Sequence, residues 1–217
     1  MYHYTESIMN ERAFAFIYGC ALRDAVLQKA FTGKRAWIID VAKARKSVKA
    51  YIDRILNGDF PEDGDKDAHD KLFLETAKAV CQALNSYEKK PDGAGSFSFG
   101  NAQKLINMTV KHVYLHTYTI SRLATPSFRD RFRHCHCPMD SIMLKKVRDL
   151  KKDGLSSGFL KPWGKEDFKG GESMPDRYCE FQTAIRDMIS TSGGDIFPIE
   201  FDFAVWKSDN TDDAMEK

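Results

Sequence analysis

The stretch AQKLINMTVKHVYLHTYTISRL, residues 102–123, decides the fold class. It is largely apolar and predicts one long helix from about Ala102 to Leu123. The same helical period dominates the rest of the chain, and runs of alternating β-branched residues are few. The sequence therefore predicts a mainly α protein.

Other helices are predicted on both sides of this stretch, separated by turns rich in Gly, Pro and Asp. They run from the N-cap Asn10 to Gly33, from Ala36 to Gly58, from Ala68 to Tyr87, from Pro138 to Gly154, and from Pro175 or Asp176 past Met188. Residues 59–65 and 89–100 are predicted loops. Ile196–Trp206 alternates apolar and acidic residues, which favours an isolated strand or an extended segment. Residues 1–207 should form one domain of two helical lobes, and residues 208–217 a flexible tail.

The composition excludes several classes of protein. Among the 217 residues, 42% are hydrophobic and 29% are charged, which is typical of a soluble globular domain. The longest apolar stretch, Ala13–Leu22, is far shorter than the roughly 20 residues that span a bilayer. The start, MYHYTE, lacks a basic signal-peptide region. We therefore expect a cytoplasmic protein without a membrane partner, and the five irregularly spaced cysteines are expected to be reduced thiols.

The small net charge of +2 hides an uneven distribution. Residues 101–165 hold thirteen of the 33 bases and only four of the 31 acids, a local charge of +9, whereas the remainder carries −7. Such a segment attracts polyanions, with nucleic acid the commonest candidate. A well-solvated helical surface explains the charge equally well.

Two residues in this basic segment are candidates for catalysis. Lys104 lies near the start of the long apolar helix, where desolvation and the positive helix end favour the neutral amine that a nucleophile needs. Asp140 lies near the start of the next predicted helix. Taken singly, Lys104 is an ordinary snorkelling lysine and Asp140 an ordinary helix cap.

Together, the two residues resemble a known family. The run Gln103–Lys111, QKLINMTVK, followed 36 positions after Lys104 by the Asp of Cys137–Asp140, CPMD, resembles the archaeal 8-oxoguanine DNA glycosylases (AGOG) and small bacterial phage-defence glycosylases of the same helix-hairpin-helix superfamily. The resemblance covers about residues 98–147. It implies a two-lobed helical glycosylase fold with Lys104 as the Schiff-base nucleophile and Asp140 as its partner.

The resemblance also implies that the protein flips a damaged or modified base out of double-stranded DNA, with AP-lyase activity. We expect the base to be 8-oxoguanine or a modified cytosine, and the protein to be a monomer without a cofactor or metal. The superfamily's Leu-Pro-Gly-Val-Gly hairpin and its four-cysteine iron–sulfur spacing are absent from the sequence. The residues expected to bind substrate or DNA are Gln103, the aromatic pocket candidates Phe99, Trp163, Tyr178, Phe203 and Trp206, and the phosphate-contact candidates Lys111, Arg129, Arg131 and Arg133.

Three alternatives stay open at this point. The run His134–Cys137, HCHC, could supply zinc ligands, completed by Cys179 or His112. Arg129 and His134 have the Arg-x4-His spacing of the all-helical HEPN ribonucleases. The chain could also be a DNA-binding module without catalytic activity.

Overall fold

The computed structural model describes residues 10–26, 41–60, 62–86, 95–120, 126–151 and 153–212, and for residues 63, 118–120, 126 and 206–212 it describes the backbone alone. Within these ranges the regular structure is helical, and the sole β interaction is an isolated bridge between Lys169 and Ser173. The predicted mainly α class is therefore confirmed. No helix in the described part of the chain has the length and apolar character needed to cross a membrane.

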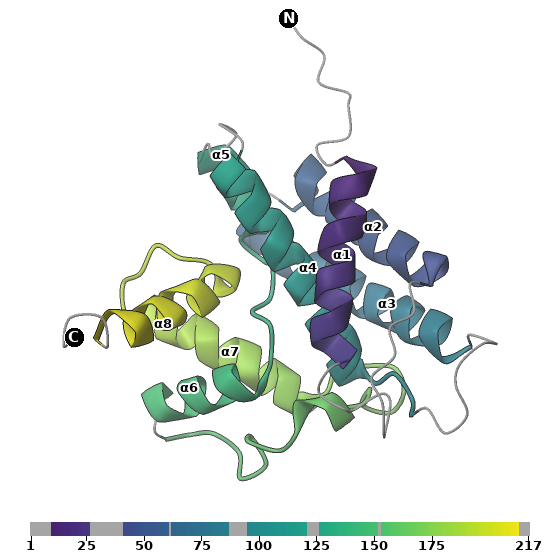
Figure 1. The fold of residues 1–217 in the computed structure, drawn as a ribbon. Coiled ribbons are helices and arrows are strands. Elements are labelled where there is room, and N and C mark those ends of the chain that lie inside the picture. Colours follow the sequence, from purple (N-terminus) through teal and green to yellow (C-terminus); the bar gives the residue numbers. More distant parts are fainter. Residues whose placement is uncertain are drawn as a thin grey trace, which may run out of the picture.

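Helix α4 (Phe99–Ile120) is the central element. Figure 1 shows it running between α1 (Glu11–Val26), α2 (Ala42–Asn57) and α3 (Lys66–Asn85) on one side and α6 (Ser141–Lys151), α7 (Asp176–Thr191) and α8 (Pro198–Asp212) on the other. Short helical turns lie in the connections, namely η1 (Asp63–Asp65), α5 (Pro126–Arg129), η2 (Asp130–Phe132) and η3 (Trp163–Lys165). Consequently, α4 contributes side chains to both groups of helices.

Local sequence explains the helix ends before α4. Asn10 caps α1 as predicted, because its Oδ1 accepts a hydrogen bond from the Arg12 N–H at 2.7 Å. Gly58 ends α2 in the left-handed conformation that glycine favours, with φ of 78°. The predicted start of this helix at Ala36 is wrong, since Val41 is extended and the helix begins at Ala42. The predicted ends Gly33, Tyr87 and Leu123 lie outside the described residues.

Helix α4 begins three residues earlier than predicted and includes Gly100. A Cβ at this position would lie 1.9 Å from the carbonyl oxygen of Trp163, so only glycine fits. The Gly100 N–H donates to the carbonyl of Glu166 at 2.9 Å. The first turn of α4 is therefore packed directly against the backbone around η3.

Two predictions in the C-terminal half are corrected. Pro138 and Met139 precede α6 instead of opening it, because the helix begins at Ser141. Residues 198–212 are helical, so the predicted strand or extended segment at 196–206 is wrong. Pro198 is compatible with a first helical turn, and Glu200 accepts a hydrogen bond from the Phe197 N–H at 2.8 Å. This helix also covers residues 208–212 of the predicted tail, whereas residues 213–217 lie outside the described part.

Aromatic side chains fill the interior between α3, α4 and α7. The rings of Phe73 and Tyr178 stack at 5.7 Å, and Phe99 meets Tyr178 edge-on at 5.0 Å. Phe99, Trp163 and Tyr178 are all buried, so the structure places these three pocket candidates in the hydrophobic core. Phe203 is partly buried on α8, and the side chain of Trp206 lies outside what the structure describes.

Candidate active site

Lys104 and Asp140, 36 residues apart in the chain, form a close ion pair. The Lys104 Nζ lies 2.5 Å from the Asp140 Oδ2. The lysine side chain is 9% exposed, because it projects from the buried face of α4, whereas the aspartate side chain is 23% exposed. The two residues selected from the sequence are therefore brought together at a site that is largely dry and still open on the carboxylate side.

The two carboxylate oxygens of Asp140 have different partners. Oδ2 faces Lys104, whereas Oδ1 accepts a hydrogen bond from the Met143 N–H at 2.9 Å and so caps α6. The helix-cap interpretation of Asp140 and the lysine-partner interpretation are thus both satisfied by one side chain. The cap fixes the carboxylate orientation, and the positive end of α6 stabilises its negative charge.

The segment that carries Asp140 has no regular secondary structure, and two glutamines hold it. Gln103 donates from Nε2 to the Met139 carbonyl at 2.7 Å and accepts from the Met139 N–H at 3.1 Å. Gln182 of α7 makes the same pair of bonds with Cys137, at 2.8 and 3.1 Å. Gln103 is fully buried, so the structure places it as a support of the backbone and away from the predicted contact with DNA.

A buried chain of hydrogen bonds continues from Gln103 toward α3. Asn107 donates to the Gln103 Oε1 at 3.2 Å and to the Tyr178 hydroxyl at 3.0 Å. The Tyr178 hydroxyl lies 2.8 Å from the His136 Nδ1. Since the Tyr178 hydroxyl accepts a hydrogen bond from Asn107, the network assigns it as the donor to the His136 Nδ1. The neutral His136 ring then carries its proton on Nε2.

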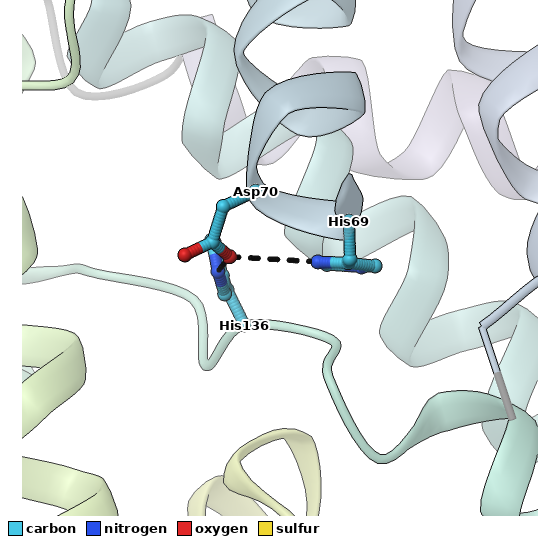
Figure 2. A group of neighbouring side chains, drawn as sticks. All are labelled: His69, Asp70 and His136. Atoms are coloured by element: carbon cyan, nitrogen blue, oxygen red, sulfur yellow. Dashed lines mark hydrogen bonds and ion pairs between the residues drawn. The ribbon is translucent and has the colours of Figure 1, made fainter. Parts of the chain in front are cut away.

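The chain of hydrogen bonds ends at a group of three side chains, His136, Asp70 and His69. Figure 2 shows these three side chains. The His136 Nε2 lies 2.8 Å from the Asp70 Oδ1, and the His69 Nδ1 lies 3.6 Å from the same oxygen. Burial lowers the pKa of His136 to about 4, so its ring is neutral near pH 7. Burial would raise the pKa of Asp70, but the hydrogen bond from His136 and the nearby imidazole of His69 hold it far below its usual range.

These three side chains form the sole group within the described ranges that has the ligand types and spacing for a metal ion, with ligand atoms within 4.8 Å of one another. The hydrogen-bond polarity does not fit a metal, however. In the tautomer that the network assigns, the His136 Nε2–H donates a hydrogen bond to Asp70 and presents no lone pair to an ion. The arrangement is better described as a carboxylate flanked by two imidazoles, with Lys66 2.8 Å from its other oxygen.

The candidate zinc ligands of the HCHC run are not gathered around one point. The His134 Nε2 donates to the Glu62 carbonyl at 2.7 Å, whereas His136 faces Asp70. Cys135 and Cys137 are buried, and burial raises the pKa of both thiols, which keeps them protonated. The run therefore serves to pack the segment that leads to Asp140.

Lys111 forms a second ion pair on α4. Its Nζ contacts the Asp202 Oδ2 on α8 and lies 5.0 Å from the centre of the Phe203 ring. Asp202 is buried, with a side chain 4% exposed. The charge of Lys111, predicted to contact a phosphate, is thus already matched inside the protein.

The three arginines predicted to contact phosphates are also engaged with the protein. Arg129 binds both carboxylate oxygens of Glu200, at 2.9 and 2.7 Å. Arg131 donates to the Leu56 carbonyl, and Arg133 lies 3.3 Å from Asp130. Arg129 and His134 of the ribonuclease alternative bind different elements, α8 and the residue before η1.

Other bases of the positive segment remain exposed to solvent. Lys145 and Arg148 lie on α6, the helix that Asp140 caps, and Lys161 and Lys165 lie in the connection to α7. Arg148 pairs with its chain neighbour Asp149 at 3.0 Å. These four bases are therefore free to face solvent, unlike Lys111 and the three arginines above.

No family model, curated protein or solved structure matches the chain. Gln182, Asp202 and Asp70 were not singled out from the sequence, because an isolated Gln or Asp within a helix gives no signal of the distant group that it binds.

Proposed function

We propose that the protein is a DNA glycosylase with AP-lyase activity that excises a damaged or modified base, 8-oxoguanine or a modified cytosine, from double-stranded DNA. The observation that carries the proposal is the 2.5 Å pair of Lys104 and Asp140. A buried lysine beside a partly exposed carboxylate supplies the nucleophile and the anion that this reaction requires.

The proposed reaction uses both groups in turn. Asp140 takes a proton from the Lys104 ammonium, and the resulting amine attacks C1′ of the flipped nucleotide. The bond between C1′ and the base breaks, and the base leaves with the electron pair and takes up the proton that Asp140 had accepted. Asp140 is thereby ionised again and stabilises the positive charge that develops on the sugar as this bond breaks. Opening of the sugar ring gives an imine on Lys104, from which β-elimination expels the 3′ phosphate before water releases the enzyme.

DNA binding is supported by the excess of bases in residues 101–165, several of which are exposed. Lys145 and Arg148 project from α6, whose first turn is capped by Asp140. Phosphates on either side of a flipped nucleotide would be attracted to this surface, and binding should weaken steeply with salt. A role in defence against phages with modified cytosines belongs to the proposal through the resemblance, and protection of cells that carry the gene would test it.

Borohydride trapping tests the reaction directly, because borohydride reduces the imine to a stable crosslink. Labelled duplexes containing 8-oxoguanine, uracil or 5-hydroxymethylcytosine derivatives are incubated with the wild type and with Lys104→Ala. We expect a crosslink with one base that disappears in Lys104→Ala. Abasic product without a crosslink would show that Asp140 activates water instead. Salt-dependent binding without either product would indicate a non-catalytic DNA-binding module.

A further inference from the structure

We infer that Gln103 and Gln182 are positioning residues for Asp140, a role that rests on the proposed function of the Lys104–Asp140 pair. Asp140 ends an irregular segment, so no ladder or helix fixes the backbone before it. The two glutamine side chains replace that missing secondary structure. They come from α4 and α7, the helices between which the segment passes.

Each glutamine side-chain amide pairs with the backbone of one residue, as a neighbouring β-strand residue would. A hydrogen-bonded pair in an antiparallel sheet exchanges one N–H and one C=O with its neighbour. Gln182 makes this exchange with Cys137 and Gln103 makes it with Met139, and Pro138 between them has no N–H to satisfy. Both glutamines are buried, so water does not compete for these four bonds.

The bonds of Gln103 join the chain neighbours of the two reacting groups. Gln103 precedes Lys104, and Met139 precedes Asp140, so the side-chain bonds and the ion pair close a short ring between α4 and the segment. A displacement of Met139 would move the Asp140 carboxylate with it. Misplacement of a reacting group by about 1 Å can cost on the order of 100-fold in rate.

The amide of Gln103 has a single orientation in this ring. Its Oε1 accepts from the Met139 N–H and from Asn107, and its Nε2 faces the Met139 carbonyl. Asn107 is itself held by Tyr178. The buried chain that ends at Asp70 therefore fixes which end of the Gln103 amide meets each backbone group.

The test replaces Gln103 with methionine, which has a similar length and cannot form these bonds. Two quantities are measured: the single-turnover rate of base excision, and the rate at which a water-soluble acylating ester labels Lys104, followed by mass spectrometry. Asp140→Asn gives the labelling rate of a lysine without its carboxylate. Asn85→Leu is the matched control, because Asn85 makes the same reciprocal pair with the backbone of Phe97, at 3.0 and 2.6 Å, away from Asp140.

For Gln103→Met we expect excision to slow by about 10- to 100-fold, the dissociation constant for DNA to stay within about twofold, and labelling of Lys104 to approach that of Asp140→Asn. Asn85→Leu should leave the excision and labelling rates unchanged. Folded Gln103→Met that labels Lys104 at the wild-type rate would overturn the inference, whatever its activity. If Gln103→Met does not fold, Gln182→Met tests the same segment with the same readouts.

The labelling readout separates the two proposals. Faster labelling in Gln103→Met, with no excision by the wild type on any duplex, would retain the positioning role and contradict the glycosylase. Excision by the wild type, together with unchanged labelling of Lys104 in Gln103→Met, would support the glycosylase and contradict the positioning role.

Discussion

Two lysine–aspartate pairs lie seven residues apart on α4, and the elements that carry their carboxylates differ. Asp202 lies within helix α8 with a side chain 4% exposed, whereas Asp140 ends an irregular segment and is 23% exposed. Residues seven apart share one face of a helix, about 10 Å apart along the axis. The same pair of charges therefore joins α4 to α8 at one position and leaves a partly exposed carboxylate at the other.

The largest effect on the excision rate is expected at Asp140. Asparagine caps a helix as well as aspartate, so Asp140→Asn keeps α6 and removes only the charge that faces Lys104. We expect single-turnover excision to fall about 1,000-fold, in the range for loss of an electrostatic or acid–base group. Gel-based cleavage of the duplex found by trapping measures this rate. A loss below about tenfold would remove Asp140 from the reaction.

Asp202→Asn should show the opposite pattern. It leaves Lys111, with a side chain only 14% exposed, without its counter-charge, and breaking such a pair costs about 3 kcal/mol of unfolding free energy. Urea denaturation followed by circular dichroism measures this loss, and the excision rate should fall by less than about tenfold. If Asp202→Asn were as stable as the wild type and as inactive as Asp140→Asn, the two pairs would not differ in role.

Acid should weaken the network that supports Asp140. Because burial lowers the pKa of His136 from 6.5 to about 4, the unfolded chain binds a proton in this window and the folded protein does not. Stability is therefore lost as the pH falls from 6.5 to 4, by about 3 kcal/mol, and the low pKa of Asp70 extends the loss to lower pH. Urea denaturation between pH 7 and 4 measures how the unfolding free energy changes with pH, and this slope should be clearly shallower in His136→Gln. An equal slope in that variant would rule out His136 as the source of the pH dependence.

The smallest effect is expected at a surface pair, which sets the reference for the two pairs on α4. Lys151 of α6 lies 2.9 Å from Asp187 of α7, with side chains 27% and 56% exposed. Asp187→Asn should change the unfolding free energy by less than about 1 kcal/mol, because solvent screens exposed charges. The same denaturation experiment measures it, and a loss comparable to that of Asp202→Asn would show that burial does not distinguish these pairs.

Helix α8 shows where sequence patterns failed. Residues 196–206 alternate apolar and acidic side chains, a period that predicts a strand, yet no strand lies in the described part of the chain to pair with it. As a helix, the segment places Asp202 against Lys111 and Glu200 against Arg129. Local period was overridden by partners that lie more than 70 residues away in the chain.

The start of α4 shows a similar limit. The glycine at position 100 predicted a turn before the helix, and the structure places it in the first helical turn. The physical reason is the carbonyl of Trp163, which leaves no room for a Cβ. A close approach of distant backbone gives no signal in the sequence around Gly100.

The sequence by itself determined the helical class, the long central helix and the choice of Lys104 and Asp140, because helical period, capping residues and the resemblance of residues 98–147 are local properties. Only the tertiary structure decided that the two side chains meet at 2.5 Å, that Gln103 supports Met139, and that Lys111 is paired with Asp202. These contacts join residues from 36 to 91 positions apart. Such partners are selected by the packing of whole helices around α4, which no short stretch of sequence encodes.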